Sequence, residues 1–306
     1  MRKSMQMQND LAAELGTAVF DVTLDAEDGA PLGNEREHAQ MIAELASSSL
    51  NQHGRVGARV HPVQHDAFSQ DLEIMLGSAG DKLAYIMVPK PESLVDVASA
   101  CDAIDKTSRA LGLQRQIPVH ALIETHGALR DVFAICAHPR IESVSFGLMD
   151  FVSEHRGAVP SQAMGVQGQF AHPLVMRAKL EIAAAAHASG KTPSHCVVTE
   201  FKDRLALSEA ARKACQELGY TRMWSIHPDQ IRTIVDAFAP HADEIQIAGE
   251  ILLAAQAANW APVRHKTRGH ETLHDRASYR YFWQILERAH QTGRLQDVTV
   301  HTEFFA

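Results

Sequence analysis

Two carboxylates end neighbouring apolar runs in the middle of the chain. The run VHALIET stops at Glu124 and ESVSFGLMD stops at Asp150, while GALRDVFAICAHP between them has apolar residues at helical spacing. A strand, helix, strand unit of this kind places two parallel strand ends side by side, so we expect Glu124 and Asp150 to converge. Two hard oxygen ligands, with water and substrate, are a common way to hold Mg²⁺. A role for both as turn or capping residues is the alternative.

The elements around this unit alternate regularly along the chain. About seven apolar runs of strand length each precede a helical pattern, and a polar or charged residue ends nearly every run. This alternation predicts an α/β fold, a (β/α)8 TIM barrel over residues 1–258 with a C-terminal helical extension over 259–306. One strand is lacking, so the first lies upstream of Met1 or is supplied in another way. A doubly wound sheet is the alternative, weakened because no GxGxxG follows a strand.

The C-terminal extension is basic and aromatic. It predicts a helix from about Leu273 to His290 and a β-like end at VTVHTEFF. The segment His270–His274 reads HETLH, and on a helix its two histidines could bind zinc with Glu271 as a general base. No third ligand follows, so a zinc protease is a minor alternative.

Composition narrows the class of protein. The chain has 306 residues, 45% of them hydrophobic and 22% charged, which is typical of a soluble globular protein. No apolar run is long enough to span a bilayer. A net charge of −8 without a Lys/Arg cluster argues against nucleic-acid binding. The N-terminus lacks the apolar core of a secretory signal, and the four cysteines lack disulfide spacing, so we expect a cytoplasmic protein.

Six short motifs resemble, in the same order, those of the citrate lyase β-subunit and malyl-CoA lyase family, within the aldolase/citrate lyase superfamily. They are FDVTLDAEDGA at 20–30, ARV at 58–60, VPK at 88–90, ALIET at 121–125, SFGLMD at 145–150 and WSIHPDQI at 224–231. The resemblance covers roughly residues 20–240. It implies a (β/α) barrel, often a homo-oligomer (trimer or hexamer), that holds Mg²⁺ and makes or breaks a carbon-carbon bond in a CoA thioester of a hydroxy acid.

The resemblance also implies roles for individual residues. Glu124 and Asp150 would be the metal carboxylates, as the strand pattern also suggests. Arg59 would bind the substrate's carboxylate or the carbonyl where charge develops, because a planar, permanently charged fork suits that task. A salt bridge from Arg59 to the neighbouring acidic turn is the alternative.

Three further residues complete the candidate site. Glu27 and Asp28 would form an acidic mouth that orients metal-bound water, and Lys90 would lie on the substrate side. In related lyases a C-terminal segment covers a neighbouring subunit and brings an aspartate. The most similar stretch here, LHDRAS, makes Asp275 a candidate base, with a helix first-turn carboxylate as the alternative.

The sequence departs from the family pattern in four places. His61 replaces an asparagine, Arg222-Met223 replaces a glycine-lysine pair, SHCVVTE lacks a PVDG-type segment, and the tail lacks the expected glycines. These changes fall where CoA or the acyl partner would lie.

The leading hypothesis is a Mg²⁺-dependent lyase for a malyl-CoA, citramalyl-CoA or citryl-CoA type of thioester, with thioester hydrolysis as a possible further outcome. The alternatives are a CoA-independent 2-oxo acid aldolase and a non-catalytic barrel that serves as a binding or assembly protein.

Overall fold

The computed structural model describes residues 1–30, 32–267 and 269–306, and its internal contacts divide the chain into two compact units. The first comprises Met1–Asn9 and Phe20–Phe238, and the second Asp10–Val19 and Ala239–Ala306. The boundary expected at residue 258 thus differs from this division, because residues 239–258 have their contacts in the second unit.

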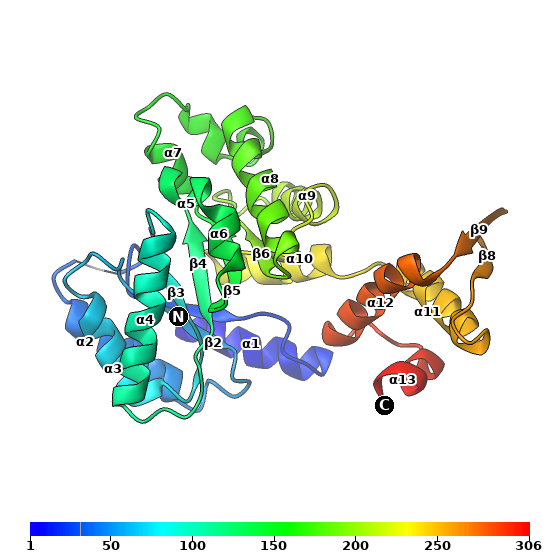
Figure 1. Ribbon diagram of the computed structural model, residues 1–306, viewed down its shortest axis with the longest axis horizontal. Helices are drawn as coiled ribbons and strands as arrows, with labels where there is room; N and C mark the ends of the chain where they lie inside the picture. The colour runs from blue at the N-terminus through cyan, green and yellow to red at the C-terminus, as the bar shows by residue number, and fades with distance from the viewer. Residues whose placement is uncertain (31, 268) are drawn as a thin grey trace. The chain divides into compact units, whose positions relative to one another are not determined.

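The first unit is built on a curled, wholly parallel sheet (Figure 1). Its strands pair in sequence order, each with the next. They are β1 (Val22–Asp25), β2 (Val56–Arg59), β3 (Leu83–Val88), β4 (Val119–Ile123), β5 (Ile141–Phe146), β6 (Thr192–His195) and β7 (Arg222–Met223). The α/β prediction is confirmed, with seven strands among the described residues where the ideal barrel has eight.

Helices connect the strands of the first unit. They are α1 (Arg2–Leu15), whose last residues belong to the second unit, α2 (Glu35–Ser47), α3 (Phe68–Ala79), α4 (Leu94–Ala110), α5 (His126–Arg130), α6 (Val132–Ala137), α7 (Leu148–Ser153), η1 (Ser161–Met164), η2 (Gly168–Phe170), α8 (Pro173–Ala188), α9 (Arg204–Gln216) and α10 (Pro228–Phe238). Within the described ranges, no helix is both long and apolar enough to cross a membrane.

Two connections differ from the sequence prediction. The single helix expected between β4 and β5 is divided at Asp131, which ends α5 and precedes α6. The strand expected over SHCVVTE is shorter and earlier, because β6 ends at His195. Beyond it the carbonyl oxygens of Val197 and Val198 accept hydrogen bonds from the side chains of Gln169 (3.3 Å) and Gln230 (2.7 Å). Side chains thus replace a strand ladder there.

An ion-pair triad links the first and last strands of the curl. Asp21, which precedes β1, pairs with Arg55 before β2 (2.7 Å) and also with Arg222 of β7. Polar side chains also link β1 and β3. The Tyr85 hydroxyl bonds the Thr23 hydroxyl at 2.6 Å, and a Cβ added at Gly57 would lie 2.4 Å from the Tyr85 ring.

A buried histidine continues this polar layer. His120 of β4 bonds the hydroxyls of Ser143 (2.6 Å) and Ser145 (2.8 Å), both on β5. Burial lowers the pKa of His120 to about 3, so the imidazole is neutral and its two ring nitrogens take opposite hydrogen-bonding roles.

The second unit has its own small apolar core. It contains α11 (Ala242–Ala257), an antiparallel hairpin of β8 (Val263–Thr267) and β9 (His270–His274), α12 (Arg276–Gln291) and α13 (Val298–Phe305). Its buried side chains include Ile251, Leu252, Leu286 and Val300.

One expectation for this segment is confirmed and one is wrong. The helix expected from about Leu273 to His290 is α12, whereas the β-like VTVHTEFF is the helix α13. HETLH, which the zinc alternative would need as a helix, is the strand β9. Asp297 caps α13 by accepting hydrogen bonds from the Thr299 and Val300 amides (2.8 and 3.1 Å). This cap and the burial of Val300 outweigh the strand preference of the β-branched residues.

We expect Gly57→Ala to destabilise the protein by about 1–3 kcal/mol, because the new methyl group must displace the packed Tyr85 ring. Gly77→Ala in α3 is the control: its Cβ would meet nothing closer than Leu111 at 3.9 Å. The control should leave stability unchanged or raise it by up to about 1 kcal/mol. Urea unfolding of both variants measures the difference, and equal effects would contradict this packing argument.

Candidate functional site

A cluster of charged side chains gathers where β1 to β5 end. Among the predicted residues, the structure connects six through direct contacts or charge interactions. They are Glu27, Asp28, Arg59, Lys90, Glu124 and Asp150. Parallel strands that finish at one edge account for this convergence.

Arg59 ends β2 and lies at the centre of the acidic side. Its Nε and Nη2 donate to the two carboxylate oxygens of Asp25 at 2.7 and 2.6 Å, and Nη1 lies 2.9 Å from Glu27 Oε2. The guanidinium also lies 5.4 Å from the centre of the Trp224 ring. Burial alone would lower the pKa of Arg59, but Asp25 and Glu27 hold it above its ordinary value. These contacts form the salt bridge between Arg59 and the acidic turn that the sequence analysis gives as the alternative. They use three of the five N–H donors of the Arg59 guanidinium.

Lys90 follows β3 and links both sides of the cluster. Its Nζ lies 2.5 Å from Glu27 Oε1, 3.0 Å from Asp28 Oδ1 and 3.6 Å from Asp150 Oδ1. Its backbone φ of 47° is in the left-handed region, which is costly for a residue with a Cβ. In that conformation the Lys90 amide donates to Glu124 Oε1 at 2.8 Å.

Glu124 is the most deeply buried carboxylate of the site. The residue is 1% exposed, and burial together with the charge of Asp150 raises its pKa to about 8. Room for it exists because residue 147 is glycine: a Cβ there would lie 2.2 Å from Glu124 Oε2. Asp150 lies in the first turn of α7, and its side chain is 37% exposed. The pair therefore combines a buried and an accessible carboxylate.

The loops after β3 and β4 are fixed to each other beside Glu124. Thr125 donates through its hydroxyl to the Pro91 carbonyl at 2.6 Å and accepts from the Ala128 amide to cap α5. A Cβ at Gly127 would lie 1.8 Å from the Glu92 carbonyl oxygen, so only glycine allows this close approach. Glu124 and Lys90 thus have a fixed separation.

The charges of this cluster do not balance. Asp25, Glu27, Asp28, Glu124 and Asp150 provide five carboxylates, against two cations, Arg59 and Lys90. No set of three or more His, Cys, Asp or Glu side chains with metal-binding geometry occurs within the described ranges. Two carboxylates that leave other positions to water and substrate are the ligand set that Mg²⁺ uses.

Asp275 lies in the second unit and has a structural role there. Its carboxylate accepts from the Ala277 amide at 2.9 Å, and its own amide bonds the Ser278 hydroxyl, which together form the N-terminal cap of α12. Nearby, His270 and His274 stand at opposite ends of strand β9, too far apart along an extended backbone to share one zinc ion.

Three residues of the site were missed by sequence reasoning. In the sequence, Asp25 is only one more acidic residue of FDVTLDAEDGA, but in the structure it holds Arg59 with both oxygens. Trp224 was noted only within its motif. Gly147 gave one weak signal, a glycine directly after an apolar strand and before Asp150.

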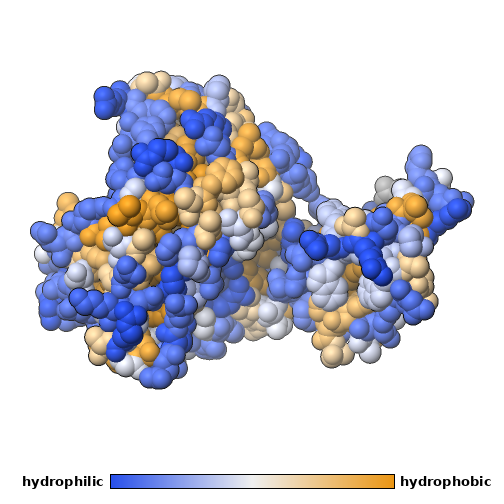
Figure 2. All heavy atoms as spheres, in the orientation of Figure 1, coloured by the Kyte–Doolittle hydropathy of each residue, from blue (hydrophilic) through white to orange (hydrophobic). Residues whose placement is uncertain are grey.

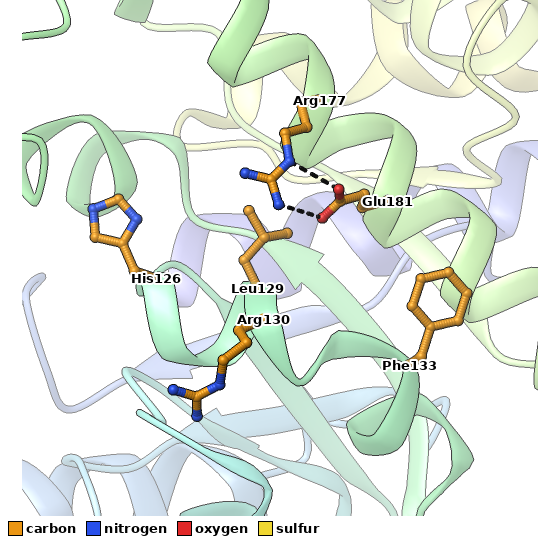
Figure 3. Close-up of a pocket in the computed structure, with 6 residues that line it drawn as sticks. All are labelled: His126, Leu129, Arg130, Phe133, Arg177 and Glu181. Carbon is orange, nitrogen blue, oxygen red and sulfur yellow. Dashed lines mark hydrogen bonds and ion pairs between the residues drawn. The ribbon is translucent and has the colours of Figure 1, made fainter.

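A surface pocket lies elsewhere on the first unit, over helices α5, α6 and α8 (Figure 3). Its lining residues are His126, Leu129, Arg130, Phe133, Arg177 and Glu181. Arg177 pairs with Glu181 at 2.8 Å, as the dashed lines show. Apolar atoms gather over this part of the unit in Figure 2, and Phe133 is 54% exposed. None of the predicted site residues lines this pocket.

Comparison with known proteins identifies relatives of this chain. Residues 5–228 match the family model described as HpcH/HpaI aldolase/citrate lyase. The chain is 50% identical to a citrate lyase from Burkholderia xenovorans LB400 of known crystal structure, with a TM-score of 0.85 over 97% of this chain and 92% of that one.

Two more distant relatives carry informative names. The L-malyl-CoA/beta-methylmalyl-CoA lyase of Cereibacter sphaeroides is 25% identical over 250 residues, 78% of this chain and 77% of that protein. The protein CitE of Mycobacterium tuberculosis, solved with magnesium, acetoacetate and coenzyme A, is 21% identical, with a TM-score of 0.68 over 94% of this chain and 95% of that one. The second likeness concerns the fold alone.

We expect Gly147→Ala to weaken Mg²⁺ binding by about 10- to 100-fold, because the added methyl group must push aside the Glu124 carboxylate. Isothermal titration calorimetry measures the affinity, and Gly77→Ala, which meets no close neighbour, is the control. Unchanged affinity in Gly147→Ala would show that the position of Glu124 does not limit metal binding.

The raised pKa of Glu124 predicts a pH dependence of stability in the metal-free protein. Between its ordinary value near 4.5 and about 8, the folded state keeps a proton that the unfolded state has released. Stability should therefore fall as the pH rises through this range, by at most roughly 1.4 kcal/mol per pH unit. Urea unfolding of wild type and Glu124→Gln from pH 5 to 8 isolates this contribution; parallel profiles would contradict it.

Proposed function

The chain belongs to the HpcH/HpaI aldolase/citrate lyase family, and on this basis we propose that it is a Mg²⁺-dependent carbon-carbon lyase that cleaves or forms a β-hydroxyacyl-CoA thioester. The observation that carries the proposal is the buried Glu124 beside Asp150, at the edge of the sheet where Arg59 ends β2 and Lys90 follows β3. The malyl-CoA lyase relative supports the substrate class.

The residues present fit a magnesium ion. Glu124 is buried, the charge of Asp150 disfavours its ionised form, and Gly147 provides the room that Glu124 Oε2 occupies. A divalent cation relieves this repulsion, so we assign Glu124 and Asp150 as its ligands. When bound, the ion polarises the oxygens of the acid partner as a Lewis acid.

The remaining side chains of the site would bind the substrate and orient water. Arg59 has two N–H donors left for the substrate's carboxylate or for the carbonyl on which charge develops, and its bonds to Asp25 keep the guanidinium plane fixed. Glu27 and Asp28 hold Lys90 at the border of the metal site and orient water. Preorganised cations of this kind stabilise developing charge without moving during the reaction.

We further propose that the second unit acts as a lid over a neighbouring subunit of a homo-oligomer, and that Asp275 handles the proton of the thioester's α-carbon. Its carboxylate is exposed and caps a helix through one oxygen. The free state of all four cysteines agrees with a reducing compartment such as the cytoplasm.

Calorimetry on wild type and Glu124→Gln, with and without acetyl-CoA plus glyoxylate or pyruvate, tests the function. We expect Mg²⁺ binding to weaken at least tenfold in the variant. In wild type, acetyl-CoA together with the oxo acid should tighten Mg²⁺ binding, and hydroxyacyl-CoA should form in the calorimeter cell. Tightening by the oxo acid alone would indicate the CoA-independent aldolase. Absence of Mg²⁺ binding by wild type would indicate a non-catalytic barrel.

A further inference from the structure

A buried histidine-aspartate pair lies close to Arg59. His61 follows β2 by two residues, and its Nδ1 lies 2.7 Å from Oδ2 of Asp71 in α3. The His61 amide donates to the same oxygen at 2.9 Å. The Asp71 side chain is 1% exposed and the His61 side chain 10% exposed, so the pair is shielded and the imidazole keeps only a small exposed part.

The pairing determines which nitrogen carries the proton. An ionised carboxylate only accepts hydrogen bonds, so Nδ1 is the N–H donor and Nε2 keeps its lone pair. Asp71 Oδ1 is buried without a partner, so His61 alone compensates this carboxylate. No hydrogen bond to Nε2 occurs among the described residues. Because Nδ1 faces Asp71, Nε2 on the opposite side of the ring points away from α3.

His61 stands at the edge of the sheet that carries the site. The Ala26 amide donates to the Arg59 carbonyl and the Val60 amide to the Met87 carbonyl, so β2 stays in register with both neighbours up to the residue before His61. The other titratable groups around the imidazole are His65, stacked on it at 4.4 Å, and Glu35 of α2, which interacts electrostatically with both histidines.

We propose that His61 is a catalytic residue whose Nε2 takes the proton of the substrate's β-hydroxyl group, with Asp71 as its positioning residue. The inference rests on the proposed function. As the hydroxyl proton moves to Nε2, the C–O bond becomes a carbonyl, the C–C bond breaks, and its electron pair forms the thioester enolate. The enolate carbon then takes up a proton, so that the hydroxyacyl thioester yields an oxo compound and an acyl thioester with no net proton change.

Other nearby groups are poorly suited to this step. Arg59 and Lys90 are cations whose pKa values are raised by their carboxylate partners against the opposing effect of burial. Glu124 is committed to the metal in the proposed function.

The test compares wild type, His61→Asn and His65→Asn, each loaded with Mg²⁺. The asparagine amide can still donate to Asp71, so His61→Asn should fold. We expect its kcat for cleavage to fall by about 100-fold or more with KM changed less than about threefold. Exchange of the thioester's α-hydrogens with D₂O should change less than about threefold, because that step does not use the hydroxyl base. His65→Asn should stay within about twofold of wild type.

A second measurement does not depend on turnover. NMR of ¹⁵N-histidine-labelled protein should find His61 protonated on Nδ1 and unprotonated on Nε2 at neutral pH. A proton on Nε2, or wild-type cleavage by His61→Asn, would overturn the role of His61 and leave the lyase function standing. Wild type that cleaves neither thioesters nor free hydroxy acids would overturn both.

Discussion

The burial of one carboxylate governs the rest of the site. Glu124 ends β4 in a place almost without water, where a negative charge is unfavourable unless a cation accompanies it. Among the residues that the structure describes, no cationic side chain forms an ion pair with this carboxylate. Glu124 accepts one backbone N–H bond from Lys90, and its Oε2 fills the place that a side chain at position 147 would take. The remaining need for positive charge makes the position suitable for a metal ion, and the left-handed backbone of Lys90 is part of the cost of building it.

The parallel topology distributes this construction over several loops. Each of the first four strands supplies one component at its end. Asp25 is the last residue of β1 and Arg59 the last of β2, Lys90 follows β3, and Glu124 directly follows β4. The cations are paired with the acidic turn, which fixes their side chains before any ligand arrives. The strands are in turn tied together below by Asp21 with Arg55 and Arg222, so the curl of the sheet and the geometry of its edge are linked.

The sequence predicts the site correctly where the end of a strand alone determines the position of a side chain. Strand-terminal carboxylates in a parallel unit must converge, so the juxtaposition of Glu124 and Asp150 could be predicted. Prediction from the sequence fails where tertiary contacts decide. VTVHTEFF has strand-forming residues, yet the Asp297 cap and the approach of Val300 to Gly249 make it a helix. Asp71 lies in an ordinary amphipathic helix, and nothing in its local sequence indicates that it receives His61. The hold of Asp25 on Arg59 likewise depends on the register of two strands.

The charge balance of the edge also implies an order of events. Even while Glu124 keeps its proton, the four other carboxyl groups outnumber the two cations, which are already paired, so an anionic substrate approaching Arg59 meets a negative potential. Those interactions act over short distances in a poorly solvated place, where salt screens them weakly. In the proposed function, a divalent cation held by Glu124 and Asp150 would reverse the local sign and displace the proton that burial favours on Glu124. On that proposal, metal binding would precede binding of the acid partner, and substrate affinity would depend on the metal.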